Sequence, residues 1–165
     1  MILTELQEKL AEAHGLAMAA AVATEKVEAI VPDPELRHDV RQLRADADET
    51  RGRCLAAEAV WGDETATSML SHANTTKEKA ADMVAAWFKA GTGPLAAWSF
   101  LAMGEAAEVA VWSAVATLAA KSGDGRDVQE LSGWAVDVQT RHLETALRGA
   151  IRLAELLDAD APRFG

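Results

Sequence analysis

Two glutamates, Glu105 and Glu108, are the only charged residues between Pro94 and Ala120, which is the most apolar stretch of the chain. Residues three apart lie on one face of a helix. Because burying an unpaired carboxylate costs several kcal/mol, each glutamate must meet a cation, a proton or strong hydrogen-bond donors. This requirement is the main indication of a functional site in the sequence.

Further ionisable residues lie near the midpoints of other expected helices. A projection at about 100° per residue places His142 and His14 on inward faces, Asp46 at the border of an apolar stripe, and Glu49 further out. All lie within about one turn, roughly 5 Å, of the midpoint of their helix, so antiparallel packing brings them to one height. The candidate metal ligands are Glu105, Glu108, His142, Asp46, His14 and Glu49.

Imidazole and carboxylate groups together suit iron, manganese or zinc, and such mixed sets occur in the cores of di-iron helical bundles. Each inward histidine has an alternative reading as a hydrogen-bonded core residue. The two glutamates have an alternative partner in the arginine stripe at positions 37, 41, 44 and 51, although its direction favours a solvated or subunit-contact face. The Glu35 and His38 pair has metal-ligand spacing, but the first turn of a helix explains its acidic residue better.

The pattern of helix signals divides the chain into five helices, and we expect an all-α fold. Thr4 and Gln7 form a capping box for a helix over about 4–30, and Asp33 with Pro34 starts a second helix that ends at Gly62. A third runs from 63 to the glycines at 91–93, a fourth from 94 to 122–123, and a fifth starts at Asp124 or Asp127.

The third helix is the most polar, so we expect it to lie across the outside of a bundle formed by the other four. Its expected apolar side is Met69, Ala73, Ala80, Met83 and Trp87. Two helical hairpins joined by a long crossover have the connectivity of a ferritin-like antiparallel bundle. We expect one domain over 1–158 and a frayed tail over 159–165.

Composition limits the choice of partners and location. The net charge of −10 disfavours nucleic acid, which is bound through clustered Lys and Arg. The single cysteine, Cys54, cannot form an intramolecular disulfide, and the charged N-terminal residues do not resemble a signal peptide. Two central carboxylates also disfavour a transmembrane reading of 94–120. We therefore expect a cytoplasmic protein with no membrane partner.

The segment from Met103 to Trp112 resembles the Glu-x-x-Glu-Ile-Ala-x-Tyr signature of YciF-like, stress-associated ferritin-like proteins. The stretch 43–55 is similar to the second-helix His-x-Glu-Glu-Thr region of that family, and 33–36 resembles the turn before it. The resemblance implies metal ligands at Glu105 and Glu108 and a ligand region at Asp46 and Glu49. The chain departs from the family in having small residues near His14 in place of an inward glutamate, and Gln139-x-x-His142 in place of Glu-x-x-His.

Our leading functional expectation is a ferritin-like protein that holds a divalent metal, Fe or Mn, in its core. The alternative is a metal-free helical bundle that acts as an interaction or dimerisation module, and a weaker third reading is a storage or DNA-protecting cage subunit. Apolar residues on the far side of the fourth helix must be covered by the third helix or by a second subunit. Those residues are Phe100, Met103, Val111 and Leu118, and we expect a symmetric dimer to bury part of them.

Overall fold

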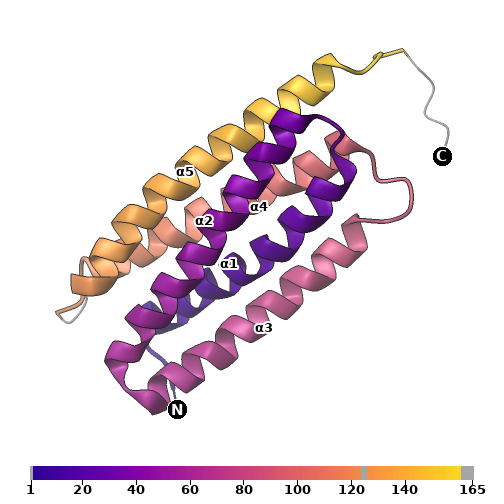
Figure 1. The fold of residues 1–165 in the computed structure, drawn as a ribbon. Coiled ribbons are helices and arrows are strands. Elements are labelled where there is room, and N and C mark those ends of the chain that lie inside the picture. The colour runs from indigo at the N-terminus through magenta and orange to yellow at the C-terminus, as the bar shows by residue number, and fades with distance from the viewer. Residues whose placement is uncertain (1, 124–125, 161–165) are drawn as a thin grey trace.

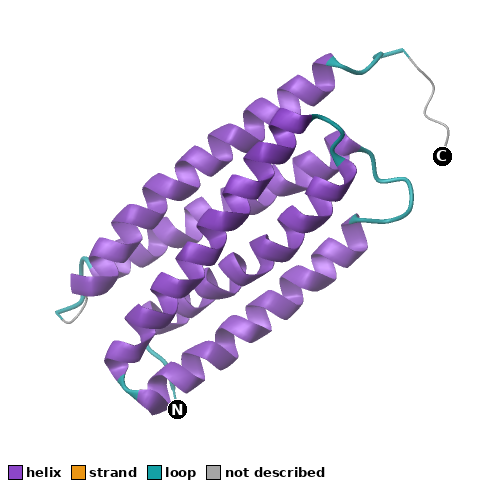
Figure 2. Cartoon of the chain, in the orientation of Figure 1, coloured by secondary structure: helices purple, strands orange, loops and turns teal. Residues whose placement is uncertain are grey.

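The computed structural model describes residues 2–123 and 126–160 and shows five α-helices, with no strand within those ranges (Figures 1 and 2). The expected helix start at Asp124 and most of the expected tail, 161–165, lie outside the described residues. The all-α prediction is confirmed. The helices are α1 (Glu5–Ile30), α2 (Pro34–Glu58), α3 (Asp63–Trp87), α4 (Pro94–Ala119) and α5 (Arg126–Glu155), with a 3-10 turn, η1, at Ala59–Trp61.

The helix starts follow from local side-chain chemistry. Thr4 and Gln7 form the expected reciprocal capping box, in which the Thr4 side chain accepts from the Gln7 amide and the Gln7 side chain accepts from the Thr4 amide. The Asp33 side chain accepts from two backbone amides of α2, and Pro34 occupies the first turn. Gly62 has a φ of 84°, a conformation that favours glycine, and so lets the chain turn directly from η1 into α3.

Four of the helices form a closed bundle. Each of α1, α2, α4 and α5 packs against two of the others, in the cyclic order α1, α2, α5, α4. Successive helices along the chain run in opposite directions (Figure 1). The fifth, α3, packs along α1 outside this group and links the two hairpins. At its end, the Trp87 ring lies 5.5 Å from the Phe100 ring of α4.

Two apolar clusters fill the bundle, one toward each end. One cluster joins Leu10 of α1 to Trp112 of α4, and the other joins Val40 of α2 to Trp98 of α4. On α2, α4 and α5, Asp46, Glu105, Glu108, Gln139 and His142 lie in sequence between the residues of these two clusters. These five polar side chains therefore lie across the middle of the core.

The buried face of α3 differs in part from the apolar face expected from the sequence. Met69 and Ala73 are buried as expected, but Met83 is 59% exposed and Trp87 is 40% exposed, whereas Val84 is buried. The reason is that α3 packs mainly against α1 and meets α4 only near the end of α3. The buried face of α3 is therefore narrower than that of a helix with neighbours on several sides.

The predicted uncovered surface of α4 is smaller than expected. Phe100 is buried against Phe88, and Val111 and Leu118 pack beside the cluster that contains Trp112. Only Met103 of the four residues remains half exposed, at 49%.

By length and composition alone, α4 is also the one helix in the described ranges that could cross a membrane, and here it packs against α1 and α5.

A candidate buried polar site between α2, α4 and α5

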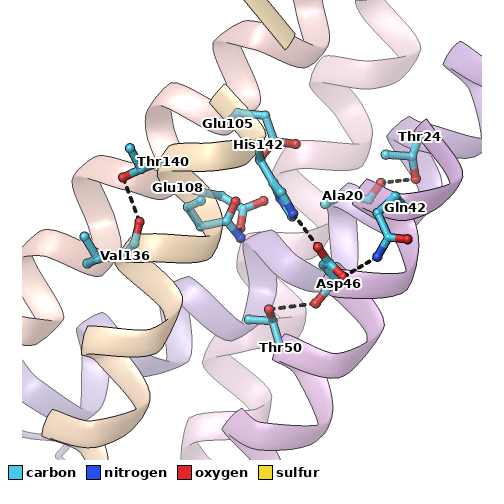
Figure 3. A network of polar contacts seen from close by, with 11 residues as sticks. Ala20, Thr24, Gln42, Asp46, Thr50, Glu105, Glu108, Val136, Thr140 and His142 are labelled. Carbon is cyan, nitrogen blue, oxygen red and sulfur yellow. Dashed lines mark hydrogen bonds and ion pairs between the residues drawn. The ribbon is translucent and has the colours of Figure 1, made fainter. Parts of the chain in front are cut away.

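Five polar residues from three helices meet in the middle of the bundle, and Figure 3 labels four of them, Asp46, Glu105, Glu108 and His142. We call them the polar cluster: Asp46 of α2, Glu105 and Glu108 of α4, and Gln139 and His142 of α5. Glu105, Glu108, Gln139 and His142 are each at most 5% exposed. The helical stripes of α4 and α5 carry these residues inward, because each lies at an apolar position of its helix.

His142 lies between two carboxyl groups. Its Nε2 is 2.9 Å from Asp46 Oδ2, and its Nδ1 is 3.4 Å from Glu105 Oε2. The longer contact is an ion pair that does not meet hydrogen-bond geometry, so Glu105 Oε2 is buried without a hydrogen-bond partner in the described structure. Glu105 and His142, which the sequence places at one height in the bundle, are thus in contact, and Glu105 Oε2 makes no hydrogen bond.

Glu108 is held differently. Gln139 Nε2 donates to Glu108 Oε2 at 2.8 Å, whereas Gln139 Oε1 has no hydrogen-bond partner in the described residues. Burial raises the pKa of Glu108 well above its ordinary value, and repulsion from Glu105 raises it further. The protonated form of Glu108 is therefore favoured relative to a carboxyl group in water.

The pKa of His142 is also raised, although burial here acts in the opposite direction. Burial lowers this pKa, but the contacts with Glu105, and then the hydrogen bond and attraction to Asp46, raise it by a larger amount. The imidazolium form of His142 is consequently favoured between the two carboxylates. Gln42 Nε2 donates to Asp46 Oδ1 at 2.8 Å and fixes the remaining oxygen of Asp46 (Figure 3).

His14 does not join the polar cluster. Its Nδ1 lies 2.8 Å from Glu58 Oε1, with both side chains at most 2% exposed. Glu58 is a buried residue that the sequence analysis missed, although its spacing of four from Cys54 on the apolar stripe of α2 was a usable signal. The pKa of the Cys54 thiol is raised by burial and then by repulsion from Glu58 and Glu108, so both carboxyl groups lie close enough to act on it.

Glu49 lies outside the site. Its side chain is 51% exposed and pairs with Arg53 one turn along α2. Three of the arginines considered as partners of the buried glutamates pair elsewhere: Arg41 and Arg44 with Glu28 of α1, and Arg51 with Asp48. The partners of Glu105 and Glu108 are instead His142 and Gln139.

The polar cluster contains residue types that bind metals, but their side chains are not arranged to hold an ion. Within 2–123 and 126–160, no group of three or more His, Cys, Asp or Glu side chains is disposed to hold a metal ion. What the cluster has is three carboxyl groups, one imidazole and an unsatisfied carboxylate oxygen. In comparisons with protein-family models, curated proteins and solved structures, nothing matches this chain.

Proposed function

We propose that this protein is a ferritin-like bundle that binds a divalent metal ion, Fe or Mn, at the polar cluster. The bundle order α1, α2, α5, α4 with α3 as the crossover supports the ferritin-like reading. Imidazole and carboxylate ligands from facing helices suit these metals. Glu105, Glu108 and His142 would hold the ion, and Asp46 would position His142.

The observation that carries this proposal is the unsatisfied oxygen of Glu105. It faces Nδ1 of His142 at 3.4 Å, while Nε2 of the same ring is held by Asp46. A metal-binding histidine commonly donates its second ring nitrogen to a carboxylate, and Asp46 occupies that place. Binding would also require these side chains to move, because no group of three or more His, Cys, Asp or Glu side chains in the described residues is arranged to hold an ion.

A bound ion of this kind supplies Lewis-acid or redox chemistry. The chain itself provides a dry, apolar surrounding, with Trp98 and Trp112 fully buried on either side of the cluster along α4. Gln139 keeps Glu108 oriented through the amide hydrogen bond. Deprotonation of Glu108 and His142 accompanies metal binding, because metal ligands must give up their protons.

Elemental analysis of untagged protein, followed by anaerobic calorimetric titration with Fe(II) and Mn(II), tests the proposal. We expect about one metal ion per chain, and loss of binding in Glu105→Gln. Glu49→Gln is the matched control, because Glu49 is an exposed glutamate paired with Arg53, and it should bind as the wild type does. Absence of metal in the purified protein, together with no heat of binding for either ion, would overturn the proposal.

A second candidate is a metal-free bundle that acts as a dimerisation module. It is favoured by the way His142 already bridges Asp46 and Glu105, which leaves the cluster partly satisfied without an ion. Exposed apolar side chains such as Met83, Met103 and Ile151 offer surface for a second subunit. Sedimentation at micromolar concentration decides this point, since a strict monomer with no metal would exclude both readings.

The resemblance to stress-associated proteins supports a cytoplasmic role in stress protection as part of the same proposal. A storage or DNA-protecting cage is less favoured, because a net charge of −10 does not attract DNA. The same elemental analysis separates a cage, which would hold hundreds of metal ions per assembly, from the single site proposed here.

A further inference from the structure

A pocket of about 210 Å³ opens between α1, α3 and α4. It exists because α3 packs along α1 and leaves a gap beside the middle of α4. The side chains of Ala19 and Ala20 on α1 are too short to fill this gap. Met83 of α3 and Met103 of α4 contribute to its walls, and both are about half exposed. The pocket is somewhat larger than an apolar cavity of about 150 Å³ that can hold benzene.

The lining is apolar except at one place. Of the described residues that line the pocket, Glu105 and Glu108 are the only ones with polar side chains. The pocket therefore borders the polar cluster at Glu105 and Glu108, whereas Asp46 is not among the lining residues. Glu105 is 3% exposed and its Oε2 has no hydrogen-bond partner in the described structure. Apart from the 3.4 Å ion pair with His142, this carboxylate oxygen makes no hydrogen bond, and a donor that reaches the Glu105 carboxylate lowers the cost of burying it.

We propose that this pocket binds a small apolar molecule that carries a primary ammonium group, with the ammonium at Glu105 and the hydrocarbon between α1, α3 and α4. The charge of the cluster selects a cation, since the two carboxyl groups of Asp46 and Glu105 share a single imidazole, that of His142. A charge-assisted hydrogen bond is stronger than one between neutral groups. The hydrocarbon gains by leaving water for the alanine and methionine side chains.

This inference does not rest on metal binding. The ammonium group needs the pocket and the Glu105 side chain that lines it, and neither depends on a bound metal ion. A metal ion at Glu105 would compete with the ammonium group. The binding experiment is therefore done on protein treated with a chelator, so that its outcome is separate from that of the metal titration.

The test compares three probes of the same shape by calorimetry: hexylammonium, hexanol and hexanoate. We expect hexylammonium to bind, hexanol to bind at least about tenfold more weakly, and hexanoate not to bind, because only the first can pair with Glu105. Glu105→Gln should weaken hexylammonium binding about tenfold or more, whereas Glu49→Gln should leave it unchanged.

A pair of alanine variants on adjacent residues of α4 tests the location. Ala107 lines the pocket and is exposed at its edge, so Ala107→Phe should obstruct the pocket and abolish hexylammonium binding. Ala106 is also exposed but does not line the pocket, and Ala106→Phe is the control for a large surface side chain. Circular dichroism melts of both variants check that they fold.

Three results would overturn the inference. The first is equal affinity for hexylammonium and hexanoate, which would exclude recognition by a carboxylate. The second is equal weakening by Ala106→Phe and Ala107→Phe, which would place binding elsewhere. The third is the absence of any heat of binding when hexylammonium is titrated to millimolar concentration into the folded, chelator-treated wild type.

Discussion

His14 Nδ1 lies 2.8 Å from Glu58 Oε1 in a pair whose side chains are only 1% and 2% exposed. The contact joins the first half of α1 to the last turn of α2, which are 44 residues apart in sequence. Because both side chains are buried, this pair is shielded from solvent. It therefore contributes to the fold in a way that exposed pairs on the same helices do not.

Replacing Glu58 by alanine should destabilise the protein by about 1–3 kcal/mol, because His14 would remain buried without its partner. Glu58→Gln keeps a hydrogen-bonding group at the position and should cost less. Urea unfolding of both variants measures the difference. Glu49→Ala removes an exposed partner of Arg53 and should change stability by less than about 1 kcal/mol. Equal losses for Glu58→Ala and Glu49→Ala would contradict this account.

Glu108→Gln should stabilise the metal-free protein at neutral pH. Burial and repulsion from Glu105 raise the pKa of folded Glu108 above its ordinary value of 4.5. At neutral pH the unfolded chain ionises this group more readily than the folded chain, so Glu108 lowers the free energy of unfolding. This cost to the wild type disappears as the pH falls to the ordinary pKa, where the unfolded chain is protonated as well.

The stabilising effect of Glu108→Gln should therefore be present at pH 7 and largely absent at pH 4. Urea unfolding in the presence of a chelator at the two pH values measures it. The groups nearest to Glu108, namely Glu105, Gln139 and the Cys54 thiol, are unchanged in this variant. A loss of stability at both pH values would instead indicate that Glu108 is needed as a charged acceptor.

Gly149→Ala should destabilise the contact between α5 and α4. A Cβ at this position would lie 2.2 Å from the ring of Trp98, whose Nε1 donates to the Ala146 carbonyl oxygen at 2.5 Å. Because the indole is fully buried, it cannot move away without disturbing the apolar cluster around it. We expect a loss of about 1–3 kcal/mol, as in other overpacked cores.

Gly133→Ala is the matched control for Gly149→Ala. It lies on the same helix, is exposed, and has nothing within 4 Å of a built Cβ. It should stabilise the protein by about 0.5–1 kcal/mol, because alanine restricts the unfolded chain more than glycine does. Thermal and urea unfolding of the two variants should thus move in opposite directions. Destabilisation by both would mean that the steric explanation is wrong.

Asp46→Asn tests the positioning role of Asp46 in the proposed metal site. Loss of the carboxylate that holds His142 Nε2 should weaken Mn(II) affinity about tenfold to a hundredfold, as is typical for such partners. Asp48→Asn removes an exposed carboxylate two residues away, which faces Arg51, and should leave the affinity unchanged. Calorimetric titration gives the affinities, and unfolding of the metal-free variants separates a site effect from a general loss of stability.

Much of the local structure could be predicted from the sequence. The capping box at Thr4 and the Asp33 and Pro34 pair set the first two helix starts through contacts between near neighbours. The burial of Glu105 also followed from the sequence, because its place in the apolar stripe of α4 depends only on helical periodicity. These features require no knowledge of which helices pack together.

Only the tertiary structure decided the partners. Helical periodicity gives the face on which His14 lies, but its pairing with Glu58 depends on how far α1 and α2 are displaced along their axes. The exposure of Met83 and the pocket beside Glu105 likewise depend on which neighbour α3 packs against. Periodicity fixes the direction of a side chain around its own helix axis, whereas the neighbour that it meets is set by the packing of whole helices.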